Sequence, residues 1–245
     1  MGMGMEQAAV HRDIRAAWLG RAEYRAAWDL QVQLVREVDE GTRGDTLLML
    51  EHPPTYTIGS QKHPEHLLFS REELAERGIA LFEIDRGGDI TYHGPGQLVG
   101  YPIIRLEGPG IDLHGYLRDL EEAIIRYLAS RGIAAERKPT YTGVWVGDRK
   151  IAAIGVKANR SRRRKGYVTS HGFAFNIKAG IEQEGFAGII PCGISEYGVT
   201  SLEECLGQPM TVQEAAAELL PYWAEVFRYP AAVLSQLKEE EAWTR

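Results

Sequence analysis

Helix-like and strand-like repeats of apolar residues alternate along all 245 residues of this chain, and the alternation restricts the possible folds more than any other feature. Helices are predicted over 22–40, over 112–132 from an Asp112 N-cap, and from a Thr211/Glu214 capping box to about Val226. Strands are predicted at 46–51, 143–155 and 168–177. At 44% hydrophobic residues, this length supports one core, so one mixed α/β (α+β) domain is expected.

Three details of these elements are specific predictions. The segment 143–155 is expected to form two strands joined by a tight Gly-Asp turn, which puts Lys150 at the start of the second strand. The part of the chain after Pro230 is expected to form a short helix at most. The first helix is expected to bury Trp28, Val32, Leu34 and Val35.

Composition and charge exclude several classes of protein. No apolar stretch approaches the roughly 20 residues that a membrane span needs, and 1–12 reads as a disordered tail without the basic and apolar regions of a secretory signal. Two cysteines, Cys192 and Cys205, support neither a disulfide framework nor a metal site, so a reducing cytoplasm is expected. The net charge of −6 gives no general reason to bind nucleic acid, although the run 160–165 is basic.

The segment 86–97, RGGDITYHGPGQ, packs four glycines and a proline between two apolar stretches. Glycine lets the backbone approach a ligand closely, which favours a binding loop. A tight hairpin with a strand at 90–92 and a turn at 94–96 explains the same residues, and the two interpretations are compatible. The segment lacks the lysine and hydroxyl residues of a phosphate-binding loop, so that class of site is not predicted.

Cys192 stands between a proline and a glycine, where a side chain can be reached, although a lone cysteine is more often buried and inert. Cys205 has the surroundings of an ordinary helix position. Lys150 reads by default as a surface lysine; beside Cys192 its ammonium would favour the nucleophilic thiolate and could shuttle a proton. His93 or His171 could form a rival cysteine–histidine pair, or could be structural. Sequence spacing does not decide between these arrangements.

Four segments together resemble the lipoyl(octanoyl) transferase family. They are 86–103 (RGGDITYHGPGQLVGYPI), 143–155 (GVWVGDRKIAAIG), 170–176 (SHGFAFN) and 191–193 (PCG). The resemblance implies the catalytic fold of the lipoate and biotin protein ligases, with a mixed sheet flanked by helices. It also implies a catalytic domain over 13–228 and a C-terminal extension over 229–245.

The same resemblance implies the roles of individual residues. Cys192 would be the acyl-thioester nucleophile, and Lys150 would lower its pKa and act as acid and base. His171 is a further candidate for the pocket, in a positioning role. The implied substrate-binding residues are Arg86, Gly87, Gly88, Asp89, Ile90, Thr91, Tyr92, His93, Ala153, Ile154, Gly155, Gly172, Phe173 and Ala174.

The resemblance implies transfer of octanoyl, or lipoyl, from acyl carrier protein to a lysine of a lipoyl domain. The acceptors would be the 2-oxoacid dehydrogenase complexes and the glycine cleavage H protein, without ATP, cofactor or metal, by a monomer. Rival hypotheses are an ATP-dependent lipoate or biotin ligase, an amidotransferase acting between lipoyl domains, and a non-catalytic module that binds carrier proteins. The Cys192 and Lys150 pair favours transfer, because a ligase needs no cysteine.

The basic run 160–165 departs from the family pattern, because the chain between Gly155 and His171 is several residues longer than the usual spacing. A basic loop near the site would suit an acidic carrier protein, whose docking opposite charges accelerate and orient. A solvated hairpin tip explains the same residues equally simply.

Overall fold

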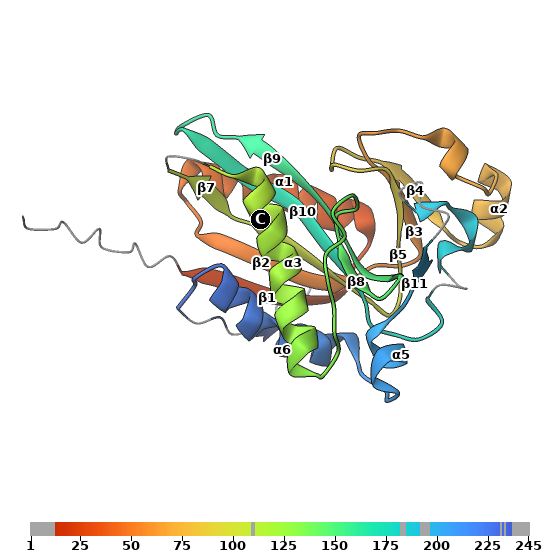
Figure 1. Ribbon diagram of the computed structural model, residues 1–245. Coiled ribbons are helices and arrows are strands. Elements are labelled where there is room, and N and C mark those ends of the chain that lie inside the picture. The colour runs from red at the N-terminus through yellow and green to blue at the C-terminus, as the bar shows by residue number, and fades with distance from the viewer. Residues whose placement is uncertain are drawn as a thin grey trace, which may run out of the picture.

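The computed structural model of the protein describes residues 13–108, 111–181, 185–191, 197–230, 232 and 234–236. Helices and strands alternate through this part of the chain, as predicted (Figure 1). In chain order they are β1 (Ile14–Arg21), α1 (Tyr24–Glu40), β2 (Asp45–Glu51), β3 (Thr55–Ile58), the 3₁₀ turn η1 (Pro64–His66), α2 (Arg71–Glu76), β4 (Ala80–Glu83), β5 (Ile90–His93), β6 (Gln97–Ile103), β7 (Arg105–Glu107), α3 (Leu113–Ser130), β8 (Val144–Val146), β9 (Arg149–Arg160), β10 (Gly166–Asn176), the 3₁₀ turn η2 (Phe186–Gly188), β11 (Gly198–Val199), α5 (Leu202–Leu206), α6 (Val212–Val226) and β12 (Leu234–Gln236).

Two sheets organise these elements. In the described residues the large sheet has the order β11-β9-β10-β6-β2-β1-β12, with β7 paired to β10 and β8 paired to β9. It is mixed, because β1 runs parallel to β2 whereas β6 runs antiparallel to both β2 and β10. The small sheet has the order β4-β3-β5 and lies to one side of the large one, next to α2 (Figure 1).

Helices cover both faces of the large sheet, and strand alternation explains how. On β2, Leu47 and Met49 join the core that contains α3 and α6, whereas Leu48 and Leu50 join the core beneath α1. All four side chains are at most 1% exposed. A strand buried on both faces needs apolar residues at successive positions, and β2 supplies them.

The predicted helix ends and turns are largely confirmed. Asp112 caps α3 through its carboxylate, which accepts the His114 N–H at 2.9 Å. Both hydrogen bonds of the Thr211/Glu214 capping box are present at the start of α6. The segment 143–155 forms the predicted pair of strands, β8 and β9, and Lys150 is the second residue of β9. None of the helices in the described ranges is long and apolar enough to cross a membrane.

The first helix differs from its prediction. It begins at Tyr24, and Val32 is 43% exposed rather than buried. The buried stripe runs through Tyr24, Ala27, Gln31, Leu34 and Val38, which follow the 3.6-residue period and leave Val32 beside the stripe.

One of the two interpretations of 86–97, the hairpin, and the prediction for the segment after Pro230 are wrong. The strands β5 and β6 do not form a hairpin, because β5 pairs with β3 in the small sheet whereas β6 pairs with β2 and β10 in the large one. The turn 94–96 therefore carries the chain from one sheet to the other. The segment after Pro230 contains a strand rather than a helix: β12 lies parallel to β1, with Leu234 opposite Ala16. Edge pairing with β1 outweighs the weak local preference for a helix.

Candidate active site

A groove runs along the antiparallel pair β9 and β10, beside the junction of the two sheets. Ala153 lies opposite Ala174, and Gly155 lies opposite Gly172. Two cavities follow this pair and share Thr91, Ala153 and Ala174 in their walls. We call them the Lys150 cavity, with about 440 Å³ of empty space, and the Arg86 cavity, with about 450 Å³. Small residues at the register positions where the cavities meet leave room for a continuous ligand.

The Lys150 cavity brings together residues from both sheets and from the C-terminal part of the chain. Lys150 is half-buried, and its Nζ lies 4.8 Å from the ring centre of Trp145. A Cβ at Gly143 would lie 3.4 Å from Lys150 Cε and only 2.5 Å from Ala152 O, so glycine is required for this close packing. The lining residues are Thr91, Gln97, Trp145, Lys150, Ala153, Ala174, Asn176, Phe186, Pro191, Tyr197, Gly198 and Val199.

The predicted nucleophile, Cys192, lies outside the described residues. Pro191 and Tyr197, on either side of the segment 192–196, both line the Lys150 cavity. Backbone hydrogen bonds hold the residues before Pro191. Ile190 N–H donates to His66 O at 2.9 Å, and Leu68 N–H donates to Gly188 O at 2.9 Å. The predicted approach of Lys150 to Cys192 stays a prediction. The other cysteine, Cys205, lies half-buried on α5, with its Sγ 3.8 Å from Thr200 Oγ1.

The Arg86 cavity gathers most of the residues that the sequence nominated for the substrate pocket. Thr91 and His93 face it from β5, whereas the alternate residues Ile90 and Tyr92 pack into the core of the small sheet. Asp89 also lies off the cavity wall, and its carboxylate pairs with His66. The lining residues are Tyr24, Arg86, Gly87, Gly88, Thr91, His93, Tyr101, Ala153, Ile154, Gly155, His171, Gly172, Phe173 and Ala174.

The Arg86-Gly87-Gly88 loop closes this cavity because its backbone packs directly against two other glycines, Gly155 on β9 and Gly59 after β3. Gly87 N–H donates to Val156 O on β9 at 2.9 Å. A Cβ at Gly155 would lie 3.0 Å from Gly87 O, and a Cβ at Gly59 would lie 2.3 Å from Gly88 O. Any side chain at either position would push the loop away, so close backbone packing explains these glycines.

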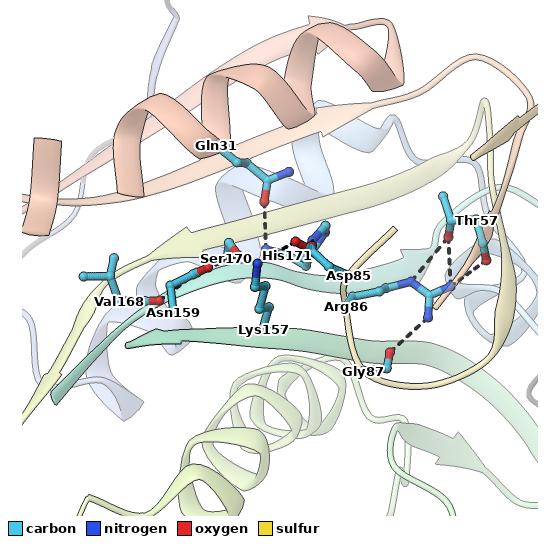
Figure 2. Close-up of polar contacts among 10 residues, drawn as sticks. All are labelled: Gln31, Thr57, Asp85, Arg86, Gly87, Lys157, Asn159, Val168, Ser170 and His171. Carbon is cyan, nitrogen blue, oxygen red and sulfur yellow. Dashed lines mark hydrogen bonds and ion pairs between the residues drawn. The ribbon is translucent and has the colours of Figure 1, made fainter. Parts of the chain in front are cut away.

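Arg86 is buried, at 7% exposure, and its guanidinium is held by the small sheet (Figure 2). Its Nη2 donates to Thr57 O at 2.7 Å and to Thr57 Oγ1 at 2.8 Å, and its Nη1 donates to Gly87 O at 3.0 Å. A buried cation needs hydrogen-bond partners, and these bonds hold the guanidinium in one direction. The guanidinium therefore gives this end of the groove a permanent positive charge.

A second polar cluster, at His171, lies near Arg86 (Figure 2), and His171 lines the same cavity. His171 has a left-handed φ of 56°, between the stretches of β10 that pair with β7 and β6, and its N–H donates to Gln31 Oε1 at 2.7 Å. Its Nε2 lies 2.9 Å from Asp85 Oδ1, and Lys157 Nζ lies 2.5 Å from Asp85 Oδ2. The hydrogen bond from His171, with help from Lys157, holds the pKa of Asp85 well below its usual range, and burial lowers the pKa of His171.

Two further histidines near the groove, His52 and His93, have lowered pKa values, which favour the neutral imidazole. Burial lowers the pKa of His52 to about 4, and burial together with the nearby His52 and Arg86 lowers the pKa of His93 well below its usual value. His52 lies between Ala22 O at 2.7 Å and Tyr101 Oη at 2.8 Å. A neutral imidazole donates with one nitrogen and accepts with the other, so it fits between such partners.

Several lining residues were missed at the sequence level. Gln97 and Tyr101 belong to the segment 86–103 and Asn176 to the segment 170–176, so the resemblance pointed near them without assigning a role. Tyr24 is the first residue of α1, about 60 positions before Arg86, and no local pattern marks it.

The basic run 160–165 is far from Lys150 and lies beyond the Arg86 end of the groove. It forms the tip of the β9–β10 hairpin, and Lys150 lies at the other end of β9, about 33 Å away at 3.3 Å per residue. Asp39 at the end of α1 accepts from Ser161 Oγ at 2.5 Å, and Glu107 pairs with Arg164 at 3.5 Å. Arg162, Arg163 and Lys165 are exposed. The expectation of a basic loop near the site is corrected for the Lys150 end, because a long regular hairpin carries the run away from Lys150.

Comparison with known proteins defines the class of this fold and groove. Residues 23–224 match the family model of the lipoyl protein ligase A/B catalytic domain. Lipoate-protein ligase A bound with ATP superposes with a TM-score of 0.68 at 17% identity, covering 93% of this chain and 91% of that one. A bipartite lipoate protein ligase from Thermoplasma acidophilum gives 0.65 at 16%, covering 93% and 89%. The predicted lipoate ligase fold is confirmed.

Sequence relatives narrow the class. An octanoyltransferase of Chloroflexus aurantiacus is 49% identical over 218 residues, covering 88% of this chain and 95% of the relative. An octanoyltransferase of Rubrobacter xylanophilus is 46% identical over 231 residues, covering 94% and 100%. The chain belongs to the octanoyltransferase family, which confirms the family and the acyltransferase class predicted from the sequence.

Proposed function

We propose that the protein transfers an octanoyl group from octanoyl-acyl carrier protein to a lysine of a lipoyl domain, as a step in making protein-bound lipoate. The groove is the observation that carries this proposal. An acyl chain in the Arg86 cavity would extend past Ala153 and Ala174 and present its carbonyl in the Lys150 cavity, which Pro191 lines. Pro191 directly precedes Cys192. Membership of the octanoyltransferase family supports the choice of acyl group.

In the first half-reaction the Cys192 thiolate attacks the carbonyl carbon of the carrier thioester. The carbonyl π electrons move to oxygen, and the tetrahedral intermediate collapses by breaking the bond to the carrier sulfur. The carrier thiolate leaves with a proton from the Lys150 ammonium, which leaves Lys150 neutral. A cation beside the thiol also favours the thiolate, the form that attacks.

In the second half-reaction a neutral acceptor lysine attacks the acyl-Cys192 thioester. Its nitrogen forms the amide bond, the carbon–sulfur bond to Cys192 breaks, and neutral Lys150 takes the proton that the nitrogen releases. Lys150 and Cys192 thereby return to their starting states. No nucleotide enters, because the acyl group arrives already activated as a thioester.

The pocket residues would act mainly through shape. Ala153, Gly155 and Gly172 leave space along β9 and β10 for the acyl chain, and the loop at Gly87 and Gly88 covers it. Of the other nominated residues, Ile90 and Tyr92 would shape the groove indirectly, by packing the small sheet behind Thr91 and His93. His171 would position the far wall through Asp85.

The partners follow from the reaction: acyl carrier protein as donor, and the lipoyl domains of 2-oxoacid dehydrogenase complexes and the glycine cleavage H protein as acceptors. An ATP-dependent ligase shares this fold, and the likeness to lipoate-protein ligase A bound with ATP shows the fold alone. A ligase would modify a lipoyl domain from free acid and ATP, which makes the two functions separable by experiment.

The test is intact-mass and peptide mass spectrometry of the protein mixed with octanoyl-acyl carrier protein, without ATP or acceptor. We expect one octanoyl adduct on Cys192 that discharges onto an added lipoyl domain. Cys192→Ser should give no adduct, whereas Cys205→Ser, the matched control on α5, should behave as the wild type. Modification of a lipoyl domain only with free octanoate and ATP would overturn the proposal.

A further inference from the structure

A buried chain of hydrogen bonds leaves Arg86 and runs toward the Lys150 cavity. Arg86 donates to Thr57 Oγ1 from Nη2 at 2.8 Å and from Nε at 3.3 Å, and Thr57 Oγ1 lies 3.4 Å from His93 Nε2. A guanidinium can only donate, so the Thr57 hydroxyl accepts from it and keeps its own hydrogen for His93. His93 Nε2 is therefore an acceptor, and the proton of this neutral imidazole is on Nδ1.

The hydrogen bonds continue in the same donor-to-acceptor direction through two side-chain amides. His93 Nδ1–H donates to Gln97 Oε1 at 3.0 Å, and Gln97 Nε2–H donates to Asn176 Oδ1 at 2.9 Å. Asn176 Nδ2–H donates to Thr200 O at 3.0 Å, and Thr200 N–H donates to Lys150 O at 3.0 Å. Both amide oxygens are thus occupied, and the fixed charge of the arginine determines which end of each amide carries nitrogen.

The two amides lie side by side in the wall of the Lys150 cavity. Asn176 on β10 is the register partner of Gln97 on β6, and both line the cavity with Lys150 and Pro191. Gln97 is 1% exposed and Asn176 is 3% exposed. Each amide nitrogen carries two N–H groups, and among the described residues each donates only one of them. Within the part of the chain that the structure describes, one N–H on each side chain is left for a ligand.

We propose that the Gln97 and Asn176 side-chain amides are the oxyanion donors of the acyl-transfer reaction. This inference rests on the proposed function. When the Cys192 thiolate adds to the thioester carbon, the carbonyl π electrons become an alkoxide lone pair, and the two remaining N–H groups donate hydrogen bonds to that oxygen. The same groups receive the oxyanion formed when the acceptor lysine attacks. Thr57 and His93 are positioning residues, because they keep the amide nitrogens rather than the oxygens toward the site.

The first test exchanges one atom of the substrate. Single-turnover acylation of Cys192 is measured by mass spectrometry with the octanoyl thioester of N-acetylcysteamine and with its dithioester, whose C=S sulfur accepts hydrogen bonds weakly. Asn176→Ala and Gln97→Ala should each slow the thioester roughly 10²- to 10³-fold. The ratio of thioester to dithioester rates should fall at least about tenfold in each variant, because intrinsic reactivity cancels within the ratio. A ratio equal to that of the wild type in both variants overturns the proposal.

The second test breaks the chain of hydrogen bonds at Thr57, which lines neither cavity. The backbone oxygen of Thr57 still accepts from Arg86 Nη2 when the side chain is changed. Thr57→Val keeps the side-chain volume but removes the hydroxyl, so the amides can flip; we expect about a tenfold loss of acylation rate with little change in the KM for the thioester. Thr57→Ser should restore the rate. Thr55→Val is the matched control, because Thr55 is a buried threonine of the same strand whose hydroxyl donates to Pro53 O, at 2.8 Å.

Equal losses in the Thr57→Val and Thr55→Val variants would show a general structural effect and overturn the positioning role. Failure of the wild type to acylate Cys192 with octanoyl-acyl carrier protein would overturn the proposed function itself. That failure is seen before any variant is compared. The proposed function and the proposed oxyanion donors can therefore be rejected independently of each other.

Discussion

The Lys150 cavity and the Arg86 cavity share three wall residues, yet their polar groups are held in different ways. At the Arg86 end, Asp85 is shared between His171 and Lys157, and Arg86 is fixed by Thr57 and Gly87. At the Lys150 end, the ammonium lies over the Trp145 ring, and two neutral amides line the wall. Charged groups held by ion pairs and hydrogen bonds keep the shape of the Arg86 cavity constant. Amide N–H groups and a lysine, by contrast, can stabilise negative charge that develops on the substrate during a reaction.

The strongest test of this difference between the two cavities is to remove the cation at the Lys150 end. Lys150→Met should lower the rate of Cys192 acylation by about 10²- to 10⁴-fold, the usual contribution of a positioned acid or base. Single-turnover kinetics with octanoyl-acyl carrier protein measure it. Lys138→Met is the control, since Lys138 lies 5.2 Å from the same Trp145 ring but pairs with Asp148 at 2.7 Å and does not line the cavity. Similar losses in both variants would contradict an acid–base role for Lys150.

Acid should lower the stability of the protein through His52, a buried histidine next to Tyr101 at the Arg86 end. The pKa of His52 is about 4 in the folded protein, below its unfolded value of about 6.5, so the unfolded state binds more protons between these values. The free energy of unfolding should therefore fall as the pH drops through this window, by about 3 kcal/mol, or roughly 10²-fold in the folding equilibrium.

Urea unfolding at several pH values between 7 and 4 measures this slope. His52→Gln should reduce this slope and leave the part that His93 and His171 contribute, whereas His114→Gln, at an exposed position on α3, serves as the control. An identical slope in wild type and His52→Gln would remove His52 from the explanation.

A smaller effect is expected when the Arg86 end is altered without touching its cation. Asp85→Asn weakens the acceptor of His171 and removes the partner of Lys157. Because Asp85 is 47% exposed, the stability cost should stay below about 1 kcal/mol. We expect KM for the octanoyl donor to rise several-fold with kcat nearly unchanged, because this wall shapes binding rather than chemistry. A fall in kcat as large as that of Lys150→Met would erase the distinction between the two ends.

The smallest effect should come from the hairpin tip, beyond the Arg86 end. Reversing Arg162, Arg163 and Arg164 to Glu should raise the KM for octanoyl-acyl carrier protein only a few-fold, and only at low salt, because exposed charges are screened within about 10 Å at 0.1 M salt. The same variant should use the N-acetylcysteamine thioester as the wild type does. Equal effects on both donors would remove the tip from carrier docking.

The sequence predicted elements whose signals are local. The Thr211/Glu214 capping box and the Asp112 N-cap were read directly, because their hydrogen bonds join residues two or three positions apart. The hairpin interpretation of 90–96 is wrong, because the local residues do not show that the strands on either side of the turn belong to different sheets. Val32 was misassigned because an apolar residue next to the buried stripe has no local mark.

The candidate site divides in the same way. The segment 86–97 pointed to the Arg86 cavity, since glycines that permit close packing are visible in a sequence. Lys150 and Lys138 both lie beside the Trp145 ring. Their other surroundings differ because of the fold, so no local sequence pattern distinguishes the two lysines. The contact between Asp85 and His171 joins residues 86 positions apart, and the Gln97 and Asn176 amides meet across 79 positions. Such pairs are fixed by sheet register, which no single segment encodes.

The parallel pairing of β12 with β1 bears on how the molecule is made. Leu234 lies opposite Ala16, and Tyr229 Oη donates to Asp45 Oδ2 at 2.8 Å, so one side of the sheet joins residues more than 180 positions apart. Chain entropy makes such contacts late and slow to form. During synthesis β1 and β2 would leave the ribosome with an open edge long before β12 exists to cover it. A nascent chain stalled before residue 234 should therefore hold a chaperone longer than one stalled after 236 with the same linker.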